Sequence, residues 1–166
     1  MAFIVGCVLA LVQQLSGINA VIFYSKNIFK QGQDPGYDAA SAARTGTVIV
    51  GVVNWASTMM AIPLLSKFGR KKLLLWGQLA MAATFIILAV LAIINVSIGI
   101  IIFTMFFLAF FEFSIGPILW LYCAEIMTEN GMAAASLITW LCTIFYAFAT
   151  PILFDNLKAY GVYFTF

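Results

Sequence analysis

The segment Ile98–Cys123 reads IGIIIFTMFFLAFFEFSIGPILWLYC and contains a single charged residue, Glu112. About 20 apolar residues cross the hydrocarbon core of a bilayer as an α-helix, so the segment predicts a membrane-spanning helix. Glu112 would lie near the middle of the bilayer, where an ionisable side chain costs about 2.5–3.5 kcal/mol on insertion scales. Such a side chain usually faces a protein interior or a water-filled path. The segment therefore indicates a protein through which a polar species crosses the membrane.

The composition of the whole chain is also that of a membrane protein. Of its 166 residues, 64% are hydrophobic and 8% are charged, and the mean hydropathy is +1.10. A soluble domain usually carries about 25% charged residues to cover its core, so we expect an integral membrane protein. The chain has no His, and its 3 Cys lie in apolar runs without metal-ligand spacing or a disulfide pattern. We therefore expect no metal site, no cofactor and no imidazole-based catalysis.

Apolar runs divide the chain into five expected spans and a stub. The spans cover residues 3–25, 45–66, 73–94, 98–123 and 132–154, and the stub covers 162–166. The first run begins without a basic leader, which is typical of a fragment or an incomplete chain rather than of a signal peptide. Five spans and a stub predict an all-α, polytopic helix bundle that forms half of a larger one.

A basic cluster sets the expected orientation in the membrane. It lies between the second and third runs and consists of Lys67, Arg70, Lys71 and Lys72. The positive-inside rule places this loop in the cytoplasm, so the loops at 26–44, 95–97 and 155–161 are expected outside. The cluster is too short for a nucleic-acid-binding arm, and no nucleic-acid partner is expected.

Three amides occur within seven residues of the first span, in QQLSGINA (13–20): Gln13, Gln14 and Asn19. Amides in lipid need hydrogen-bond partners. On a regular helix Asn19 would point about 240° from Gln13 and about 140° from Gln14. One cavity collects all three only if the helix unwinds near Gly17, as broken helices do at transporter binding sites. Hydrogen bonds that merely hold the bundle together are the alternative.

The fourth span contains a second candidate wall of a cavity. Glu112, Gly116 and Trp120 are spaced to share one face of a helix. Pro117 lacks an N–H and is expected to weaken the helix just after Gly116. The alternative is that Trp120 is an interfacial anchor and Pro117 a simple kink. Asn54 in the second span is a single amide, and its role is open at this point.

The chemistry of these side chains favours a neutral, hydroxyl-rich substrate. Amides offer donors and acceptors together, and a flat aromatic ring can pack on the C–H face of a pyranose. An anionic substrate would need a Lys or Arg within a span, and the expected spans contain none away from their ends. An intramembrane enzyme is disfavoured, because the chain has no His, no G-x-S-x-G motif and no paired aspartates within spans.

Four segments together resemble the C-terminal half of a sugar porter of the major facilitator superfamily, the family that includes the glucose facilitators. They are QQLSGINAVIFYS (13–25), FGRKK (68–72), FFEFSIGPILWLYCAEI (110–126) and the W-x9-TP segment at 140–151. The resemblance covers essentially the whole chain, from the family's seventh helix into its twelfth. QQLSGIN is highly specific, the G-R-[KR] motif alone is weak, and the ordered set is strong.

The resemblance implies a role for each matching position. The implied substrate-binding residues are Gln13, Gln14, Asn19, Asn54, Phe111, Glu112 and Trp120. The implied gating residues are Tyr24 on the extracellular side and Gly69, Arg70, Lys71 and Glu125 in a cytoplasmic ion-pair network. The implied partners are a sugar, the lipid bilayer and the missing N-terminal half-bundle.

The sequence also departs from the family's pattern. Ser66 and Lys67 stand where an acid usually precedes the G-R-[KR] turn, and the arginine after the tenth helix is missing, which puts the cytoplasmic latch in doubt. Thr139 and Thr143 replace asparagines of the eleventh helix. Ser114, Ile115 and Leu119 stand where Gly and Pro are common, which should stiffen the break.

Transport of a neutral hexose-like sugar by alternating access, as part of a larger transporter, is the function that this resemblance implies. The alternatives are a sugar-sensing homologue that does not transport and an inactive truncated fragment. Facilitated diffusion and proton symport both fit these residues. The plasma membrane is the expected location, with an internal membrane as the alternative.

Overall fold

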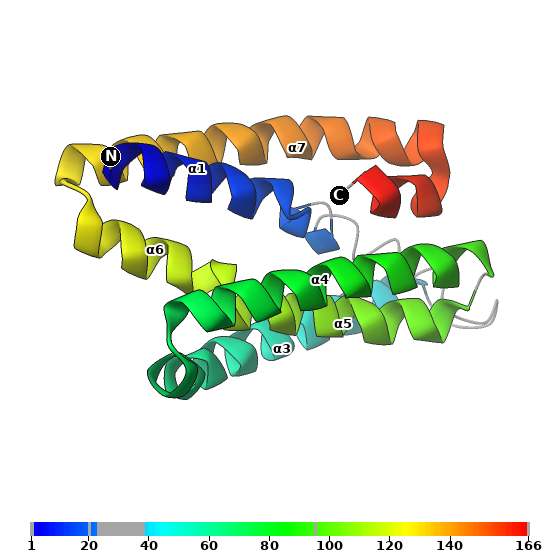
Figure 1. Cartoon of the computed structure of the whole chain (residues 1–166). Coiled ribbons are helices and arrows are strands. Elements are labelled where there is room, and N and C mark those ends of the chain that lie inside the picture. Colours follow the sequence, from blue (N-terminus) through cyan, green and yellow to red (C-terminus); the bar gives the residue numbers. More distant parts are fainter. Residues whose placement is uncertain (1, 20, 23–38, 95, 166) are drawn as a thin grey trace.

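The computed structural model describes residues 2–19, 21–22, 39–94 and 96–165, and the side chains of these residues outside 39–43, 97 and 153–165. The described residues are helical apart from short turns and contain no strand. The helices are α1 (Ala2–Leu15), α3 (Ala39–Phe68), α4 (Arg70–Ile93), α5 (Ser97–Phe113), α6 (Ile115–Ile126) and α7 (Glu129–Thr165). The protein is therefore an all-α helix bundle (Figure 1).

In the described part of the chain, four helical stretches are long and apolar enough to cross a membrane. They are Arg44–Phe68, Arg70–Ile93, Ile98–Ile126 and Glu129–Ile152, and α1 is a shorter apolar helix. The run expected at 3–25 is helical to Leu15, turns at residues 16 and 17, and is helical again at the described residues 18–19 and 21–22. Most of the polar stretch at 26–44 lies outside the described residues.

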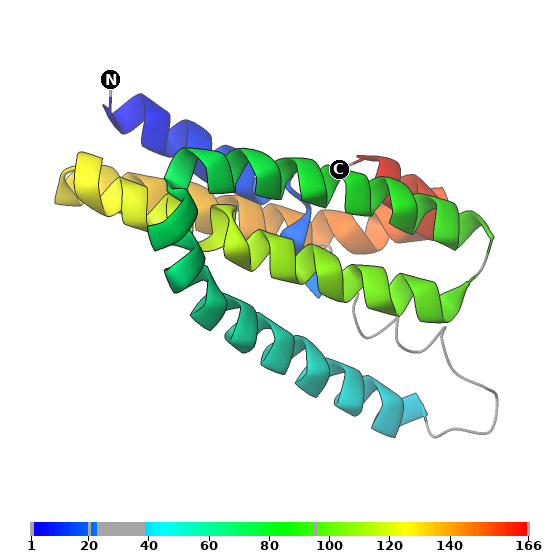
Figure 2. The ribbon, with the colours of Figure 1, turned by 60° about the horizontal axis from the view of Figure 1, so that its bottom comes forward.

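The helices pack in two groups that are joined through α4. In one group α1 packs against α6 and α7, and in the other α5 packs against α3 and α4, while α4 also contacts α7. Figure 1 shows α1 beside α7, and Figure 2 shows α3 running at an angle below the other helices. The connection from α5 to α6 carries the chain from one group to the other.

Each group has its own apolar core. The first core joins α3, α4 and α5 through residues that include Val50, Phe85, Leu88 and Phe107. The second and smaller core joins α1, α6 and α7 through Ala10, Leu119, Cys123 and Ala135. Ile18 and Val21, which follow the turn after α1, belong to the first core. The chain therefore passes between the two cores at this turn and again in the first turn of α6, between Ile115 and Leu119.

Large apolar side chains also cover the outside of the bundle. Trp55 on α3, Trp76 on α4 and Phe148 on α7 are 66%, 71% and 74% exposed. In water such a surface would drive aggregation, whereas in a bilayer these side chains meet lipid tails that are equally apolar. The outer surface thus agrees with the composition in identifying a multi-pass membrane protein.

The long apolar run at 98–123 is interrupted three residues before Pro117, whereas the sequence predicts an interruption just after Gly116. Helix α5 ends at Phe113, Ser114 adopts φ −119° and ψ −101°, and α6 begins at Ile115. Pro117 then lies in the first turn of α6, where the absence of an N–H costs least. Its effect falls on the preceding residues because a helical N–H bonds to a carbonyl four residues earlier. The break therefore lies on the N-terminal side of the proline.

The last helix is longer than the sequence suggests. A loop is expected at 155–161, but α7 is helical from Glu129 to Thr165. Between Ile152 and Gly161 the sequence contains no Gly or Pro to end a helix, and Pro151 lies inside it. The ribbon turns back on itself towards the end of α7 (Figure 1).

Candidate functional site

The turn after α1 is built around Gly17. Gly17 has φ 76°, a left-handed conformation that glycine adopts without the steric cost of a Cβ atom. The Gly17 N–H donates to the Gln14 carbonyl at 3.4 Å, and the Ser16 hydroxyl donates to the Gln13 carbonyl at 2.6 Å. These bonds replace the regular helical pattern over one turn. The unwinding near Gly17 that would bring the amides together is present.

Gln14, Asn19 and Thr143 form a group of hydrogen-bonded side chains at this turn, which we call the amide cluster. The Asn19 amide donates to Gln14 Oε1 at 2.5 Å, and the Thr143 hydroxyl of α7 lies 3.4 Å from both Gln14 Oε1 and Asn19 Nδ2. Thr143 also lies 2.9 Å from the carbonyl of Thr139, one turn earlier on α7. The 3.4 Å contacts are at the long end of hydrogen-bond geometry. A ligand hydroxyl could therefore replace them at little cost.

Gln13 precedes the cluster and is buried to the same extent. Gln13 and Gln14 are each 5% exposed, although they lie next to each other on α1. Adjacent residues of a helix point about 100° apart, so the two amides face different neighbours. The structure thus joins Gln14 and Asn19 directly and leaves Gln13 outside their hydrogen bonds.

A second polar group surrounds Glu112 on α5. The Thr58 hydroxyl of α3 lies 2.9 Å from Glu112 Oε2 and 2.9 Å from the carbonyl of Asn54. The Asn54 side chain also lies close enough to the Glu112 carboxyl to interact with it. Asn54 and Glu112, expected in one site from different spans, are therefore brought together, with Thr58 between them.

The hydroxyl of Thr58 carries one proton but faces two acceptors. When Glu112 is ionised, this proton can go to the carboxylate or to the Asn54 carbonyl, not fully to both. When Glu112 is protonated, the carboxyl can donate to Thr58 while Thr58 donates to Asn54. The geometry therefore accommodates both protonation states, and only the protonated state makes both hydrogen bonds at full strength.

Phe111, Gly116 and Trp120 surround the break between α5 and α6. Phe111 is 7% exposed and belongs to the first core, while Trp120 is half-buried and packs against the second. A Cβ atom on Gly116 would lie 3.2 Å from the Phe111 carbonyl oxygen and 3.3 Å from the Phe111 ring, so the glycine leaves room for Phe111. The single helical face expected for Glu112, Gly116 and Trp120 is interrupted, because Ser114 separates α5 from α6.

The residues of the implied cytoplasmic network meet at one end of the bundle. Gly69, with φ 76°, is the one residue between α3 and α4. Arg70 then pairs with Glu125 at the end of α6 through both guanidinium nitrogens, with Nη2 2.5 Å from Oε1. Both side chains are half exposed, and Lys71 beside them is exposed. Tyr24 lies outside the described residues.

Thr143 in the amide cluster and Thr58 beside Glu112 are hard to recognise as members of a polar site from the sequence alone. Thr143 stands out only as a replacement of an asparagine in the family's pattern. Thr58 lies four residues after Asn54, so the two share a helix face, but nothing local connects either of them to Glu112. The contact between Thr58 and Glu112 joins residues 54 positions apart in the chain.

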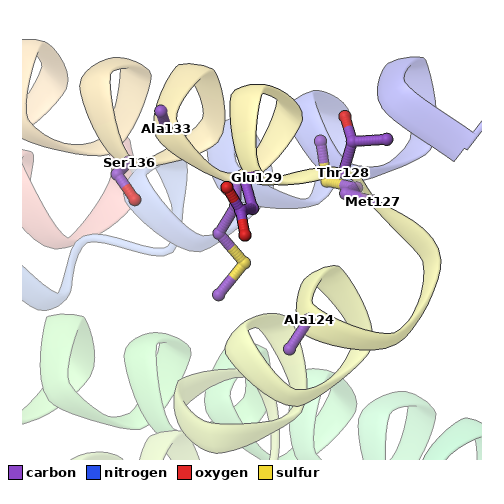
Figure 3. Close-up of a pocket in the computed structure, with 7 residues that line it drawn as sticks. Ala124, Met127, Thr128, Glu129, Ala133 and Ser136 are labelled. Carbon is purple, nitrogen blue, oxygen red and sulfur yellow. The ribbon is translucent and has the colours of Figure 1, made fainter.

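One cavity lies away from both polar groups, where the chain turns from α6 to α7. It has a volume of about 440 Å³ and is lined by Ala124, Met127, Thr128, Glu129, Met132, Ala133 and Ser136. Figure 3 shows the Glu129 side chain in the space between the two helices. None of the residues expected in a binding site lines it. Among the described residues, no group of three His, Cys, Asp or Glu could hold a metal ion.

Comparison with known proteins shows similarity over the whole chain. Residues 1–166 match the family described as "Sugar (and other) transporter". The glucose transporter GlcP of Staphylococcus epidermidis is 37% identical, over 98% of this chain and 37% of its own length. Hexose transporter 1 of Plasmodium falciparum is 31% identical, over 90% of this chain and 31% of its own length.

A solved structure shares the fold. The proton:xylose symporter XylE, a major facilitator superfamily protein bound to 6-bromo-6-deoxy-D-glucose, superimposes with a TM-score of 0.84 at 29% identity. The superposition covers 98% of this chain and 36% of XylE. The class is therefore a multi-pass membrane protein with the major facilitator fold. The chain belongs to the sugar (and other) transporter family, and it spans about a third of the length of these relatives.

Proposed function

We propose that this chain is the C-terminal half-bundle of a transporter that moves a neutral hexose-like sugar by alternating access. The observation that carries the proposal is the amide cluster at the Gly17 turn, where Gln14 and Asn19 meet Thr143 of another helix. Broken helices with free polar groups are typical of transporter binding sites near the middle of the membrane. The proposal concerns the whole protein, of which this chain would supply one wall of the site.

The buried polar side chains of the described residues are uncharged, which supports a neutral substrate. The polar residues under 10% exposed in the described part of the chain are Gln, Ser and Thr, and no Lys or Arg is among them. Amides and hydroxyls both donate and accept, as sugar hydroxyls do, so one can exchange for the other without leaving a charge unpaired. Relatives are named for glucose and for hexose transport, and others for galactose–proton and arabinose–proton symport.

The residues divide into two roles in the proposed mechanism. Gln13, Gln14 and Asn19 hold the sugar together with Asn54, while Phe111 and Trp120 shape the site beside Glu112. Arg70 and Glu125 close the cytoplasmic end, with Gly69 and Lys71 in the same turn. The half-bundle rocks against the N-terminal half and exposes the site to each side in turn.

Sugar uptake by the full-length protein tests this proposal. Gln14→Ala should lower the apparent affinity for glucose, because it removes the acceptor shared by Asn19 and Thr143. Gln13→Ala is expected to act in the same direction, since that amide is equally buried beside the cluster. The matched control is Gln78→Ala on α4, because the buried Nε2 of Gln78 has no hydrogen-bond partner to lose.

The outcomes separate transport from the alternatives. Uptake and affinity unchanged in both the Gln13 and Gln14 variants would reject the site assignment. Glucose binding by the wild-type protein in calorimetry, without uptake into vesicles, would indicate a sensor instead of a transporter. Acidification of the vesicle lumen during uptake would indicate proton symport, and uptake without it would indicate facilitated diffusion.

A further inference from the structure

A shallow groove lies between the end of α3 and the start of α4. It has a volume of about 270 Å³ and is lined by Leu64, Phe68, Lys72, Leu73 and Trp76. Four of these five side chains are apolar, and Phe68 and Trp76 are 53% and 71% exposed. The groove is thus an apolar surface with one ammonium group at its edge, and it lies outside both polar groups described above.

The lysines beside the groove carry charge that the described part of the chain does not neutralise. Glu125 pairs with Arg70, and this is the one ion pair among the described residues. Lys67, Lys71 and Lys72 are exposed within two turns of chain around Gly69. The Lys67 ammonium lies 5.7 Å from the centre of the Phe68 ring, so this charge is held over the apolar surface. The corner therefore combines a wide apolar surface with positive charge.

We propose that this groove binds an anionic phospholipid. One acyl chain lies against Leu64, Leu73 and Trp76, and the phosphate is held by Lys72 with Lys71 beside it. An occupant must be apolar along the helices and negatively charged at the basic turn, which is the chemistry of such a lipid. Tryptophan is enriched at the level of lipid headgroups, and long lysine side chains reach from apolar surfaces to them.

The expected orientation of the protein supports this choice of ligand. The positive-inside rule places the turn at Gly69 on the cytoplasmic side. Anionic lipids concentrate in that leaflet, and basic clusters next to a spanning helix attract them. The groove is lined by no member of the amide cluster and by neither Asn54, Thr58 nor Glu112, so it is separate from the proposed sugar-binding residues.

Lipid retention by the full-length protein tests the proposal. Nanodiscs are prepared from phosphatidylcholine with and without phosphatidylglycerol, and the lipids that stay bound after release are counted by native mass spectrometry. Phosphatidylglycerol should be retained in preference to phosphatidylcholine. Lys72→Gln should lower this preference on the order of fivefold, the effect of about one basic residue near a lipid surface.

Two matched variants distinguish lipid binding in the groove from unspecific attraction of anionic lipid to positive charge. Arg44→Gln removes an exposed positive charge at the other end of α3 and should leave the preference unchanged. Trp76→Ser keeps the charge but removes an apolar wall, and it should lower retention of phosphatidylglycerol. Added inorganic phosphate should not compete, because a free ion lacks the acyl chain.

Three results would overturn the proposal. The first is equal retention of the two lipids by the wild-type protein. The second is an equal effect of Lys72→Gln and Arg44→Gln, which would leave only an unspecific effect of charge. The third is retention of neither lipid with unchanged helix content by circular dichroism, which would show that protein, for example the N-terminal half, covers the groove.

Discussion

The turn at Gly17 and the break at Ser114 interrupt two helices of one bundle, but they are built from different chemistry. At Gly17 the backbone takes a positive φ, and the side chains of Gln14 and Asn19 meet in the gap. At Ser114 the φ is negative, the side chain is fully buried, and its hydroxyl donates to the Phe110 carbonyl at 2.7 Å. The first interruption exposes polar groups to a neighbouring helix, and the second satisfies its own.

Both interruptions nevertheless lie close to a point where the chain passes from one core to the other. Before the Gly17 turn Ala10 packs in the second core, and after it Ile18 packs in the first. Ile115 packs in the first core and Leu119, one turn later, in the second. The Gly17 turn thus brings polar side chains of two helices together, whereas the Ser114 hydroxyl bonds back to α5.

The largest expected effect comes from filling the space around Ser114. A Cβ atom on Gly77 of α4 would overlap the Cβ and Oγ atoms of Ser114, which is fully buried. Gly77→Ala should therefore destabilise the bundle by about 1–3 kcal/mol, as overpacking of a core does. Thermal unfolding in detergent measures the effect. A midpoint equal to that of the wild-type protein would show that the joint has room to move.

The next effect comes from Gly17. Gly17→Ala places a Cβ atom in the left-handed region and should cost about 1–2 kcal/mol in the free energy of unfolding. It should also lower sugar uptake, because the amide cluster depends on this turn. Gly51→Ala is the control: a Cβ atom added to this residue of α3 would have no neighbour within 4 Å, and alanine favours a helix. Equal stability of the two variants would contradict the importance of the turn.

A smaller effect is expected at Thr143. Thr143→Val keeps the shape of the side chain but removes the hydroxyl near Gln14 and Asn19. Loss of one hydrogen bond is worth about 1 kcal/mol, so the KM for sugar uptake should change by about fivefold. Thr104→Val is the matched control, since the Thr104 hydroxyl donates within its own helix to the Ile100 carbonyl at 2.7 Å. A larger change in KM for the Thr104 variant would argue against the amide cluster as the site.

The smallest effect on stability is expected from the ion pair at the end of the bundle. Arg70 and Glu125 are both half exposed, so solvent and salt screen their attraction. Arg70→Gln should shift the unfolding midpoint less than Gly17→Ala does, and the shift should fall with added salt. Lys71→Gln, the neighbouring charge without an ion pair among the described residues, serves as the control. A shift that is independent of salt would contradict this account.

The sequence predicted the first interruption better than the second. Three amides in seven residues require partners, and only an unwound Gly17 lets them share one, so the turn could be inferred from local chemistry. The break at Ser114 could not be located from Pro117, because a proline removes a bond to the preceding turn of the helix. Ser114 also packs against Gly77 on another helix, where a Cβ atom would overlap it, and the local sequence gives no sign of this contact.

Contacts between distant helices explain the rest of the difference. The partner of Glu112 is Thr58, and no periodicity of the sequence relates α3 to α5. The pairing of Arg70 with Glu125 was expected from the resemblance to a family, and composition alone gives no reason to choose Glu125 over Glu129. Membrane class and helical architecture follow from apolar runs, whereas the partners of polar groups depend on how the helices are placed.

Gly69 alone connects the end of α3 to the start of α4, and this short link limits how the two helices can move. The two helix ends are joined by two Cα–Cα steps of about 3.8 Å each, so they cannot separate beyond that reach without unwinding a helix. If α3 tilts, α4 has to follow at that end, and the Arg70–Glu125 pair carries the displacement to the end of α6. The turn therefore couples α3, α4 and the end of α6, so that a movement of one is passed on to the others.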